Sequence, residues 1–247
     1  MEIGRLLTAM ITPFHENGDI NFEMAAKLAK AIVDSGSDGL VIGGTTGEAP
    51  TISDEEKLKL FSVVKESIGN NHSLIAGTTN NNTKESIKLS KLAESENVDG
   101  LLLTVPSYNK PTQEGLYQHF KNISEEVSIP CILYNVPSRT SLNMTDETTI
   151  KLSELKNIIG IKEASNDLDQ ITSIIDNTSS DFKVWSGNDN ETLYIMAAGG
   201  YGVVSVAGHI VSGQIKQMIG NLLEGNIELA GSESVPPQAS FMLDEGQ

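Results

Sequence analysis

Short apolar runs alternate eight times with amphipathic segments along most of this chain, and this rhythm constrains the fold more than any other feature. The runs are rich in Val, Ile and Leu and lack polar alternation, which indicates strands that are covered on both faces. We expect the strands to lie at Leu6–Thr12, Gly39–Gly43, Ser73–Gly77, Gly100–Val105, Pro130–Asn135, Ile158–Glu163, Lys183–Ser186 and Gly202–Val206.

Helix-start signals stand between the apolar runs. Ser53 with Glu56 is a predicted capping box, Asn82 with Glu85 is a second one, and Thr145 opens an acid-rich first turn. Each strand-helix unit takes about 30 residues, as a right-handed parallel crossover requires. Eight such units, without a Gly-x-Gly-x-x-Gly turn after the first strand, favour a (β/α)8 TIM barrel over a doubly wound sheet.

Charge and composition exclude several classes of partner. The chain has 17 Lys and Arg against 33 Asp and Glu, a formal net charge of −16, which argues against nucleic acid and anionic lipid as partners. No apolar run approaches the roughly 18 residues of a membrane span, and the N-terminus lacks a signal-peptide pattern. Cys131 is the only cysteine; it fits a buried position and a reducing cytoplasm, where we expect the protein.

The residues with chemical potential stand where predicted strands end, because a barrel collects its functional groups on that rim. Lys162 follows the apolar run 158–161. Burial at that place can hold the amine partly neutral, and a neutral amine attacks carbonyl carbons whereas an ammonium ion does not. The alternative for Lys162 is an ion pair with an acid such as Glu163.

Three further features at the predicted rim have both a functional and a structural interpretation. Tyr134 ends the strand beside that of Lys162 and could relay protons, or it could simply pack. The glycine-rich segment 43–47 could offer amides and hydroxyls to a carboxylate, or form a tight turn. Arg139 could bind a second carboxylate, or make a surface salt bridge. The four histidines lack the spacing of zinc ligands, so no metal site is expected.

Three segments together resemble the signature segments of the dihydrodipicolinate synthase family, which belongs to the class I pyruvate-dependent aldolases. They are Gly44-Thr45-Thr46-Gly47-Glu48, Tyr134-Asn135-Val136-Pro137-Ser138-Arg139-Thr140 and Gly160-Ile161-Lys162-Glu163-Ala164. The resemblance extends over residues 1–230 or so, in the family's order and spacing. It implies condensation of pyruvate with L-aspartate 4-semialdehyde to 4-hydroxy-tetrahydrodipicolinate, a step of lysine and diaminopimelate biosynthesis.

The resemblance also implies roles for individual catalytic residues. Lys162 would form an imine with pyruvate, so neither a metal nor a separate cofactor is implied. Tyr134 would shuttle protons, and Thr45 would link it in a relay to Tyr108. In this family the second tyrosine enters the site from a neighbouring subunit, so the resemblance implies a homo-oligomer, either a dimer or a tetramer.

The remaining matches are substrate-binding positions. Thr46, with its backbone amide, matches the contact to the pyruvate carboxylate, and Arg139 matches the residue that receives the carboxylate of the semialdehyde. Gly187 and Val204 match residues that line the pocket.

Two regions depart from the family pattern. In the pocket where lysine inhibits some members, Asn81 and Glu85 match, but five positions differ: Ala49, Pro50, Asp54, Lys57 and Ser107. We therefore predict weak or absent inhibition by lysine. The chain also changes character near its end, which predicts a barrel domain at 1–224. Residues 225–247 then form a remnant of the C-terminal helical region and an unmatched, disordered tail, with a linker-like composition from Gly231.

Two other functions remain open from the sequence. A sister aldolase, such as N-acetylneuraminate lyase or a 2-keto-3-deoxy sugar acid aldolase, shares the lysine and the tyrosine, but Arg139 favours the dihydrodipicolinate branch. The other is a folded, catalytically silent scaffold whose truncated or replaced C-terminal region prevents productive assembly.

Overall fold

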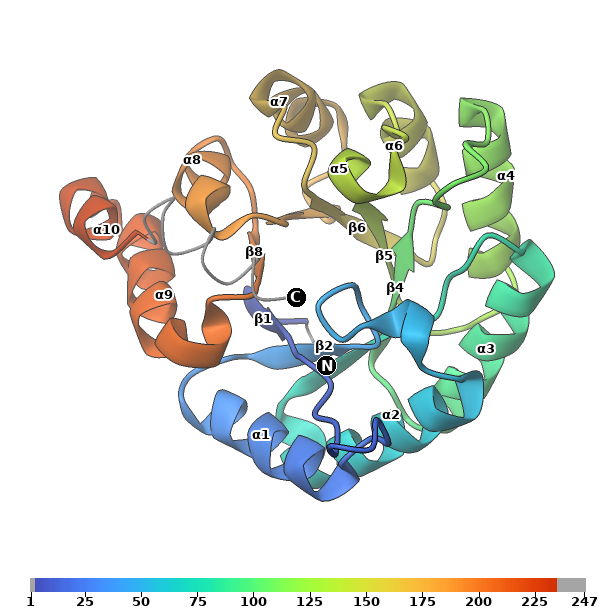
Figure 1. The fold of residues 1–247 in the computed structure, drawn as a ribbon. Coiled ribbons are helices and arrows are strands. Elements are labelled where there is room, and N and C mark those ends of the chain that lie inside the picture. The colour runs from blue at the N-terminus through green and yellow to red at the C-terminus, as the bar shows by residue number, and fades with distance from the viewer. Residues whose placement is uncertain (1–2, 235–247) are drawn as a thin grey trace.

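The computed structural model describes residues 3–234, in which eight parallel strands close into a barrel (Figure 1). Each strand pairs with its successor in sequence, and the last pairs with the first. The strands are β1 Leu6–Ala9, β2 Gly39–Ile42, β3 Ser73–Gly77, β4 Gly100–Thr104, β5 Cys131–Asn135, β6 Ile158–Glu163, β7 Lys183–Ser186 and β8 Gly202–Ser205. This closed parallel sheet confirms the predicted (β/α)8 TIM barrel.

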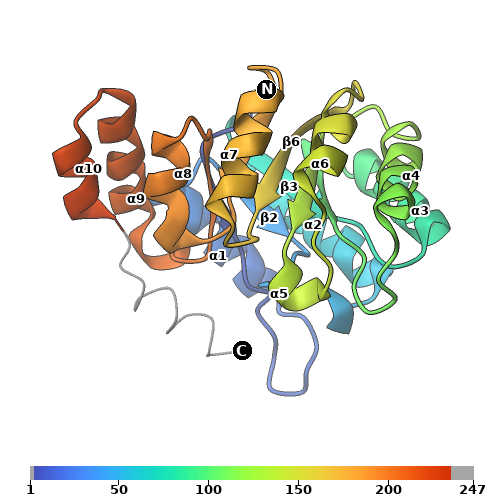
Figure 2. The ribbon, with the colours of Figure 1, turned by 90° about the horizontal axis from the view of Figure 1, so that it is seen from above.

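The helices surround the barrel, as the perpendicular views of Figure 1 and Figure 2 show. They are α1 Phe22–Asp34, α2 Asp54–Ile68, α3 Thr83–Ser95, α4 Gln113–Ser124, α5 Pro137–Thr140, α6 Asp146–Ser153, α7 Leu168–Asn177, α8 Thr192–Ala197, α9 Gly208–Leu223 and α10 Ile227–Glu233. Short 3-10 turns lie at Ala49–Thr51, Gly69–Asn71 and Asp189–Glu191. No helix within residues 3–234 combines the length and apolar character that crossing a bilayer requires.

Strands β1, β2, β4, β5 and β8 are shorter than the sequence predicts, most clearly β1. Its predicted end is Thr12, yet its pairing with β2 stops at Ala9 and Val41. Beyond that point the chain crosses the rim, where Thr12 Oγ1 donates to Gly47 O at 2.7 Å. Apolar composition continues past Ala9, but a strand lasts only as long as its neighbour offers backbone hydrogen bonds.

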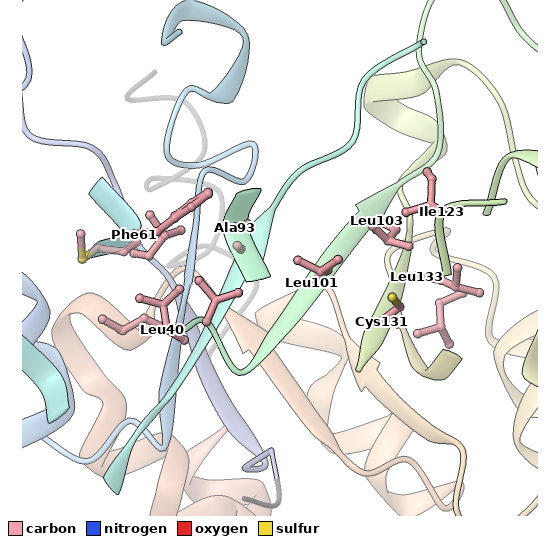
Figure 3. Close-up of a cluster of buried hydrophobic side chains, with 14 of the residues drawn as sticks. Leu40, Phe61, Ala93, Leu101, Leu103, Ile123, Cys131 and Leu133 are labelled. Atoms are coloured by element: carbon pink, nitrogen blue, oxygen red, sulfur yellow. The ribbon is translucent and has the colours of Figure 1, made fainter. Parts of the chain in front are cut away.

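Two apolar layers hold the barrel together. Inward side chains such as Leu7, Ile75 and Trp185 fill the interior, and outward side chains pack against the helices. Figure 3 shows part of the outer layer, where Leu40, Leu101, Leu103, Cys131 and Leu133 lie near Phe61, Ala93 and Ile123. Cys131 is fully buried there, as predicted, and burial raises the pKa of its thiol to about 12.

The predicted helix starts are present, with one difference in detail. Ser53 and Glu56 form the reciprocal capping box, with Ser53 N donating to Glu56 Oε2 at 2.8 Å. Thr145 caps α6 by accepting from Thr148 N. Asn82 caps α3 by accepting from Lys84 N, so a single-sided cap stands where the sequence predicts a box.

The end of the described chain is more helical than its composition suggests. Gly231, the predicted start of linker-like sequence, lies inside α10. This short helix is held by tertiary contacts: Ala230 is fully buried, and Asn221 Nδ2 of α9 donates to Glu233 Oε2 at 2.8 Å. The expected disorder of the tail concerns residues 235–247, which lie outside the described residues, and the domain boundary at 224 stays a prediction.

Candidate active site

Lys162 and Tyr134 lie side by side inside the barrel, near the carboxyl ends of their strands. Tyr134 of β5 and Lys162 of β6 are register partners, and Lys162 Nζ lies 4.3 Å from the centroid of the Tyr134 ring. Each residue is only 5% exposed. The register therefore places a phenol directly beside the amine, close to any group that forms on it.

Glu163 does not pair with Lys162. Successive side chains of a strand point to opposite faces, and the Glu163 carboxylate instead accepts from Asn135 Nδ2 at 3.1 Å, outside the barrel interior. Among the described residues, no carboxylate forms an ion pair with Lys162. The ion-pair alternative therefore does not describe this lysine.

A cavity of about 100 Å³ borders the amine. Its walls come from the segments at the ends of β2, β5, β6, β7 and β8. The lining residues are Thr45, Thr46, Tyr134, Val136, Ser138, Arg139, Lys162, Gly187, Asn188, Asp189, Asn190 and Val206. Six of the eight predicted site residues are thus brought together: Thr45, Thr46, Tyr134, Arg139, Lys162 and Gly187. A space of this size suits a ligand of a few heavy atoms.

The segment that carries Thr45 and Thr46 sits on the end of β3. Gly43 has a φ of +67°, a left-handed conformation that glycine adopts freely. A Cβ on Gly77 would lie 2.1 Å from Gly43 O, so only glycine permits this approach. The segment is therefore a tight turn that also presents two threonines to the cavity, and the two sequence interpretations are compatible.

Arg139 borders the cavity from α5, the four-residue helix that follows β5. Thr140 fixes this helix, because its Oγ1 donates to Val136 O at 3.1 Å and to Leu142 O at 2.9 Å. Ser141 ends it with a φ of 57°. Arg139 itself is exposed at the rim. A guanidinium in this place suits a carboxylate that enters from solvent.

Gly187 belongs to the wall through its backbone. Its N–H donates to Glu163 O at 2.7 Å, and a Cβ there would lie 2.6 Å from Ala164 Cβ. Close packing between the ends of β6 and β7 therefore requires glycine at this position.

The structure places two predicted site residues away from the cavity. Val204 of β8 is 1% exposed and packs among the interior side chains, where it is the register partner of Leu7. Tyr108 is 91% exposed, in the loop between β4 and α4, with a φ of 70°. Such a backbone conformation is unfavourable for tyrosine. The predicted role of Tyr108 in a neighbouring subunit stays a prediction.

Asp189 is a cavity residue that the predicted site did not include. It is 8% exposed, and its Oδ2 accepts from the amides of Val206 and Ala207, each at 3.0 Å. The Ser205 hydroxyl donates to its other oxygen. These bonds tie the segment after β7 to the end of β8. Its place two residues after Gly187, at a strand end, is the sequence signal that could have indicated it.

Two basic side chains, Lys162 and Arg139, and one hydrogen-bonded carboxylate, Asp189, line the cavity. Anionic ligands are therefore favoured there. Within residues 3–234, no group of three or more His, Cys, Asp or Glu side chains is arranged to hold a metal ion.

A larger cavity of about 510 Å³ adjoins the first and shares Thr45, Val136 and Arg139 with it. Five positions of the predicted regulatory pocket line it: Ala49, Pro50, Lys57, Asn81 and Ser107. The Lys57 side chain is 14% exposed, and its Nζ lies 3.7 Å from Asp54 Oδ1. Four of the five departures from the family pattern thus line one cavity, and the fifth, Asp54, lies beside the Lys57 ammonium group.

Comparisons with known proteins agree on one family. A family model described as the dihydrodipicolinate synthetase family matches residues 2–235. The 4-hydroxy-tetrahydrodipicolinate synthase of Dehalococcoides mccartyi is 55% identical over 231 residues, which cover 94% of this chain and 78% of that protein.

Solved structures agree as well. A dihydrodipicolinate synthase from Bacillus anthracis has a TM-score of 0.92 and 43% identity, over 94% of this chain and 80% of that one. The enzyme DHDPS from Cyanidioschyzon merolae, solved with lysine bound, has a TM-score of 0.92 and 42% identity, over 94% and 79% of the two chains.

Proposed function

This chain belongs to the dihydrodipicolinate synthetase family, and from that premise we propose how its barrel carries out catalysis. It is a lyase that condenses pyruvate with L-aspartate 4-semialdehyde to 4-hydroxy-tetrahydrodipicolinate, in lysine and diaminopimelate biosynthesis. Relatives named 4-hydroxy-tetrahydrodipicolinate synthase support this reaction over that of the sister sugar-acid aldolases. The observation that supports the mechanism is the buried pair of Lys162 and Tyr134 beside a small cavity that Arg139 borders.

Lys162 is the nucleophile in this proposal. Its neutral amine adds to the carbonyl carbon of pyruvate, and loss of water leaves an imine. The protonated imine withdraws electrons from the neighbouring methyl group, so a methyl proton leaves and an enamine forms. Tyr134 carries protons between these groups, because its ring lies against the amine. Thr46 binds the pyruvate carboxylate through its side chain and amide.

The enamine carbon then attacks the aldehyde carbon of the semialdehyde, which forms the new carbon–carbon bond and an alkoxide that takes a proton. Arg139 binds the carboxylate of this second substrate. The substrate amine adds to the imine carbon and displaces the Lys162 amine, which closes the ring and frees the enzyme. One water leaves per turn, no electrons are exchanged, and no cofactor is needed. Gly187 shapes the site as part of the cavity wall, and Val204 shapes it from the barrel interior.

A homo-oligomer, dimeric or tetrameric, completes the proposed site. Thr45 would relay protons from Tyr134 to Tyr108 of a neighbouring subunit. The 91% exposure of Tyr108 supports this proposal. Its φ of 70° belongs to a tight turn that a hydrogen bond from Asn109 N to Ser107 O closes at 2.8 Å, which presents the side chain to solvent. We further propose that residues 1–224 form the catalytic barrel and that the enzyme works in the cytoplasm.

Borohydride reduction in the presence of pyruvate tests the mechanism. Hydride converts the imine to a stable secondary amine, so peptide mass mapping should find the pyruvate adduct on Lys162. The Lys162→Ala variant should remain unlabelled and lose turnover by orders of magnitude in a coupled assay with both substrates. An adduct on a different lysine, or none on Lys162, would refute the assignment.

A further inference from the structure

Glu163 is a buried carboxyl group that the proposed mechanism leaves without a task. It is fully buried, one residue after Lys162, on the opposite face of β6. Among the residues described, no lysine or arginine pairs with it. A buried carboxylate without a counter-ion is costly, so its surroundings should show what it does.

The hydrogen bonds to the two carboxylate oxygens come from Asn135, Ser165 and Gln170. Asn135 Nδ2 of β5 lies 3.1 Å from Oε1 and 3.3 Å from Oε2. The backbone amide of Ser165 donates to Oε1 at 2.9 Å, and Gln170 Nε2 of α7 donates to Oε2 at 3.3 Å. The side chain therefore acts as an acceptor that joins β5, the end of β6 and α7.

The network continues to the segment between α5 and α6. Asn135 Oδ1 accepts from Met144 N at 3.0 Å, and Asn135 Nδ2 donates to Asn143 Oδ1 at 2.7 Å. Asn143 Nδ2 in turn donates to Gln170 Oε1 at 2.7 Å. Each amide orientation is thus fixed by its neighbours, and Glu163 is the only member of the group that accepts without donating.

This network lies one residue from the reactive pair. The ladder between β5 and β6 ends with Asn135 opposite Glu163, and the pair before it is Tyr134 opposite Lys162. Beyond this pair the backbone supplies one more bond between the two strands, from Ala164 N to Asn135 O at 2.9 Å. The side-chain bond from Asn135 to Glu163 reinforces it beside the point where Tyr134 and Lys162 must keep their mutual position.

We propose that the Glu163 carboxylate is a positioning residue for imine formation: by accepting from Asn135 and Gln170 behind the sheet, it holds Lys162 against Tyr134. This inference rests on the proposed Schiff-base function. Because Asn135 and Gln170 present N–H groups to it, the ionised form is the one that accepts from both. Burial raises the pKa of Glu163 to about 7, against the opposing effect of its hydrogen bonds.

Glu163 is the one titratable group of this network, because the groups that face it are uncharged. Asn135, Gln170 and Ser165 are uncharged, and so are Asn143 and Met144 behind them. The nearest ionisable group along the strand is Lys162, which lies on the other face. Imine formation should therefore slow as the pH falls through the pKa of this carboxyl.

The Glu163→Gln variant tests the proposal, because it replaces one acceptor oxygen with an NH2 group that faces donors. We expect kcat to fall about tenfold to a hundredfold, as for a misplaced reacting pair, with a much smaller change in KM for pyruvate. For the wild type we expect the rate of borohydride trapping on Lys162 to fall toward low pH near pH 7, and for Glu163→Gln we expect this fall to be lost. The exposed Glu147→Gln change on α6 is the matched control, with the wild-type rate and pH profile expected.

The Glu163→Asp variant guards against a simple folding defect. It keeps a carboxylate on the same face of β6, so it should retain more kcat than Glu163→Gln and keep the acid limb of the pH profile. Wild-type kcat and an unchanged acid limb in Glu163→Gln would overturn the inference, as would loss of the acid limb in Glu163→Asp. Failure to trap wild-type Lys162 at all would instead reject the proposed function.

Discussion

At the residue scale, the alternation of β6 decides the chemistry. Lys162 and Glu163 are adjacent in sequence, yet one faces the cavity and the other a network of amides on the opposite face. Because neighbouring strand residues point to opposite sides, the two charges do not neutralise each other. The amine therefore faces the cavity, and the carboxylate binds the amide network.

Arg139 gives the first prediction. Replacing it with alanine removes charge-assisted hydrogen bonds worth about 1.5–3 kcal/mol. The KM for the semialdehyde should therefore rise about tenfold to a hundredfold, because the second carboxylate loses its partner. Borohydride trapping with pyruvate alone should be unchanged. If trapping fell as much as turnover, Arg139 would instead serve the first substrate.

Glu163 gives a prediction about stability against pH. Burial raises the pKa of Glu163 from 4.5 to about 7, so the folded protein binds this proton more tightly than the unfolded chain. The resulting stabilisation is complete below pH 4.5 and is lost as the pH rises to about 7. The melting temperature of the wild type relative to Glu163→Gln should therefore decline across this interval and level off above it. Parallel curves for the two proteins would contradict the shift.

At the element scale, the turn after β2 is a loop whose shape is set by the strand beneath it. Thr45 and Thr46 reach the cavity because Gly43 takes a left-handed conformation over Gly77. The end of β3 therefore positions residues that follow β2, a dependence between elements that pair side by side.

The Gly77→Ala change tests this dependence. The added methyl would lie 2.1 Å from Gly43 O, so the turn must shift. We expect a loss of about 1–3 kcal/mol in unfolding free energy, as in other overpacked sites, together with a fall in kcat. The control is Gly220→Ala in α9, where a Cβ meets nothing within 4 Å and should stabilise the helix by about 0.5–1 kcal/mol. Full activity in Gly77→Ala would show that the turn is not held this way.

A second prediction at the scale of elements concerns helix α2. Lys57 faces the larger cavity, where Ala49, Pro50 and Ser107 offer few polar partners. Asp54 lies 3.7 Å from the Lys57 ammonium group, so the prediction depends on the missing polar partners that an α-amino acid needs. Millimolar lysine should leave the initial rate unchanged in the coupled assay. Saturable inhibition, measured beside a lysine-sensitive relative, would contradict this expectation.

At the scale of the whole molecule, the proposed site is incomplete in one subunit. Tyr108 lies on an exposed loop with an unfavourable backbone conformation, whereas its proposed relay partner Thr45 lines the cavity. An exchange of loops between neighbouring subunits would account for both observations.

Mixed subunits test that exchange. Tyr108→Phe and Lys162→Ala subunits should each be nearly inactive alone. In a hybrid, a subunit that keeps Lys162 would receive Tyr108 from its neighbour, so activity should return as hybrids form after dissociation and reassembly. Light scattering follows the assembly. No recovery in proven hybrids, or full activity in a clean monomer, would reject a role for Tyr108 across an interface.

The fold was predictable because its signals are local. Eight apolar runs, each covered on both faces, and three helix caps appear within short windows of the chain, and a closed parallel barrel is the architecture that satisfies them. Strand ends were predicted less well, since β1 stops where pairing with β2 ends and not where its apolar residues end. The helical state of Gly231 also escaped prediction, because contacts with α9 hold α10.

By itself, the sequence determined the barrel and the identity of the residues at its rim, since strand ends and their residue types are local properties. Only the tertiary structure decided which of these residues meet: it joined six of them around one cavity, buried Val204 in the interior and left Tyr108 in solvent. It also revealed Asp189 and the amide network behind Lys162. Those contacts depend on strand register and on the approach of distant segments, which exist only once the barrel has closed.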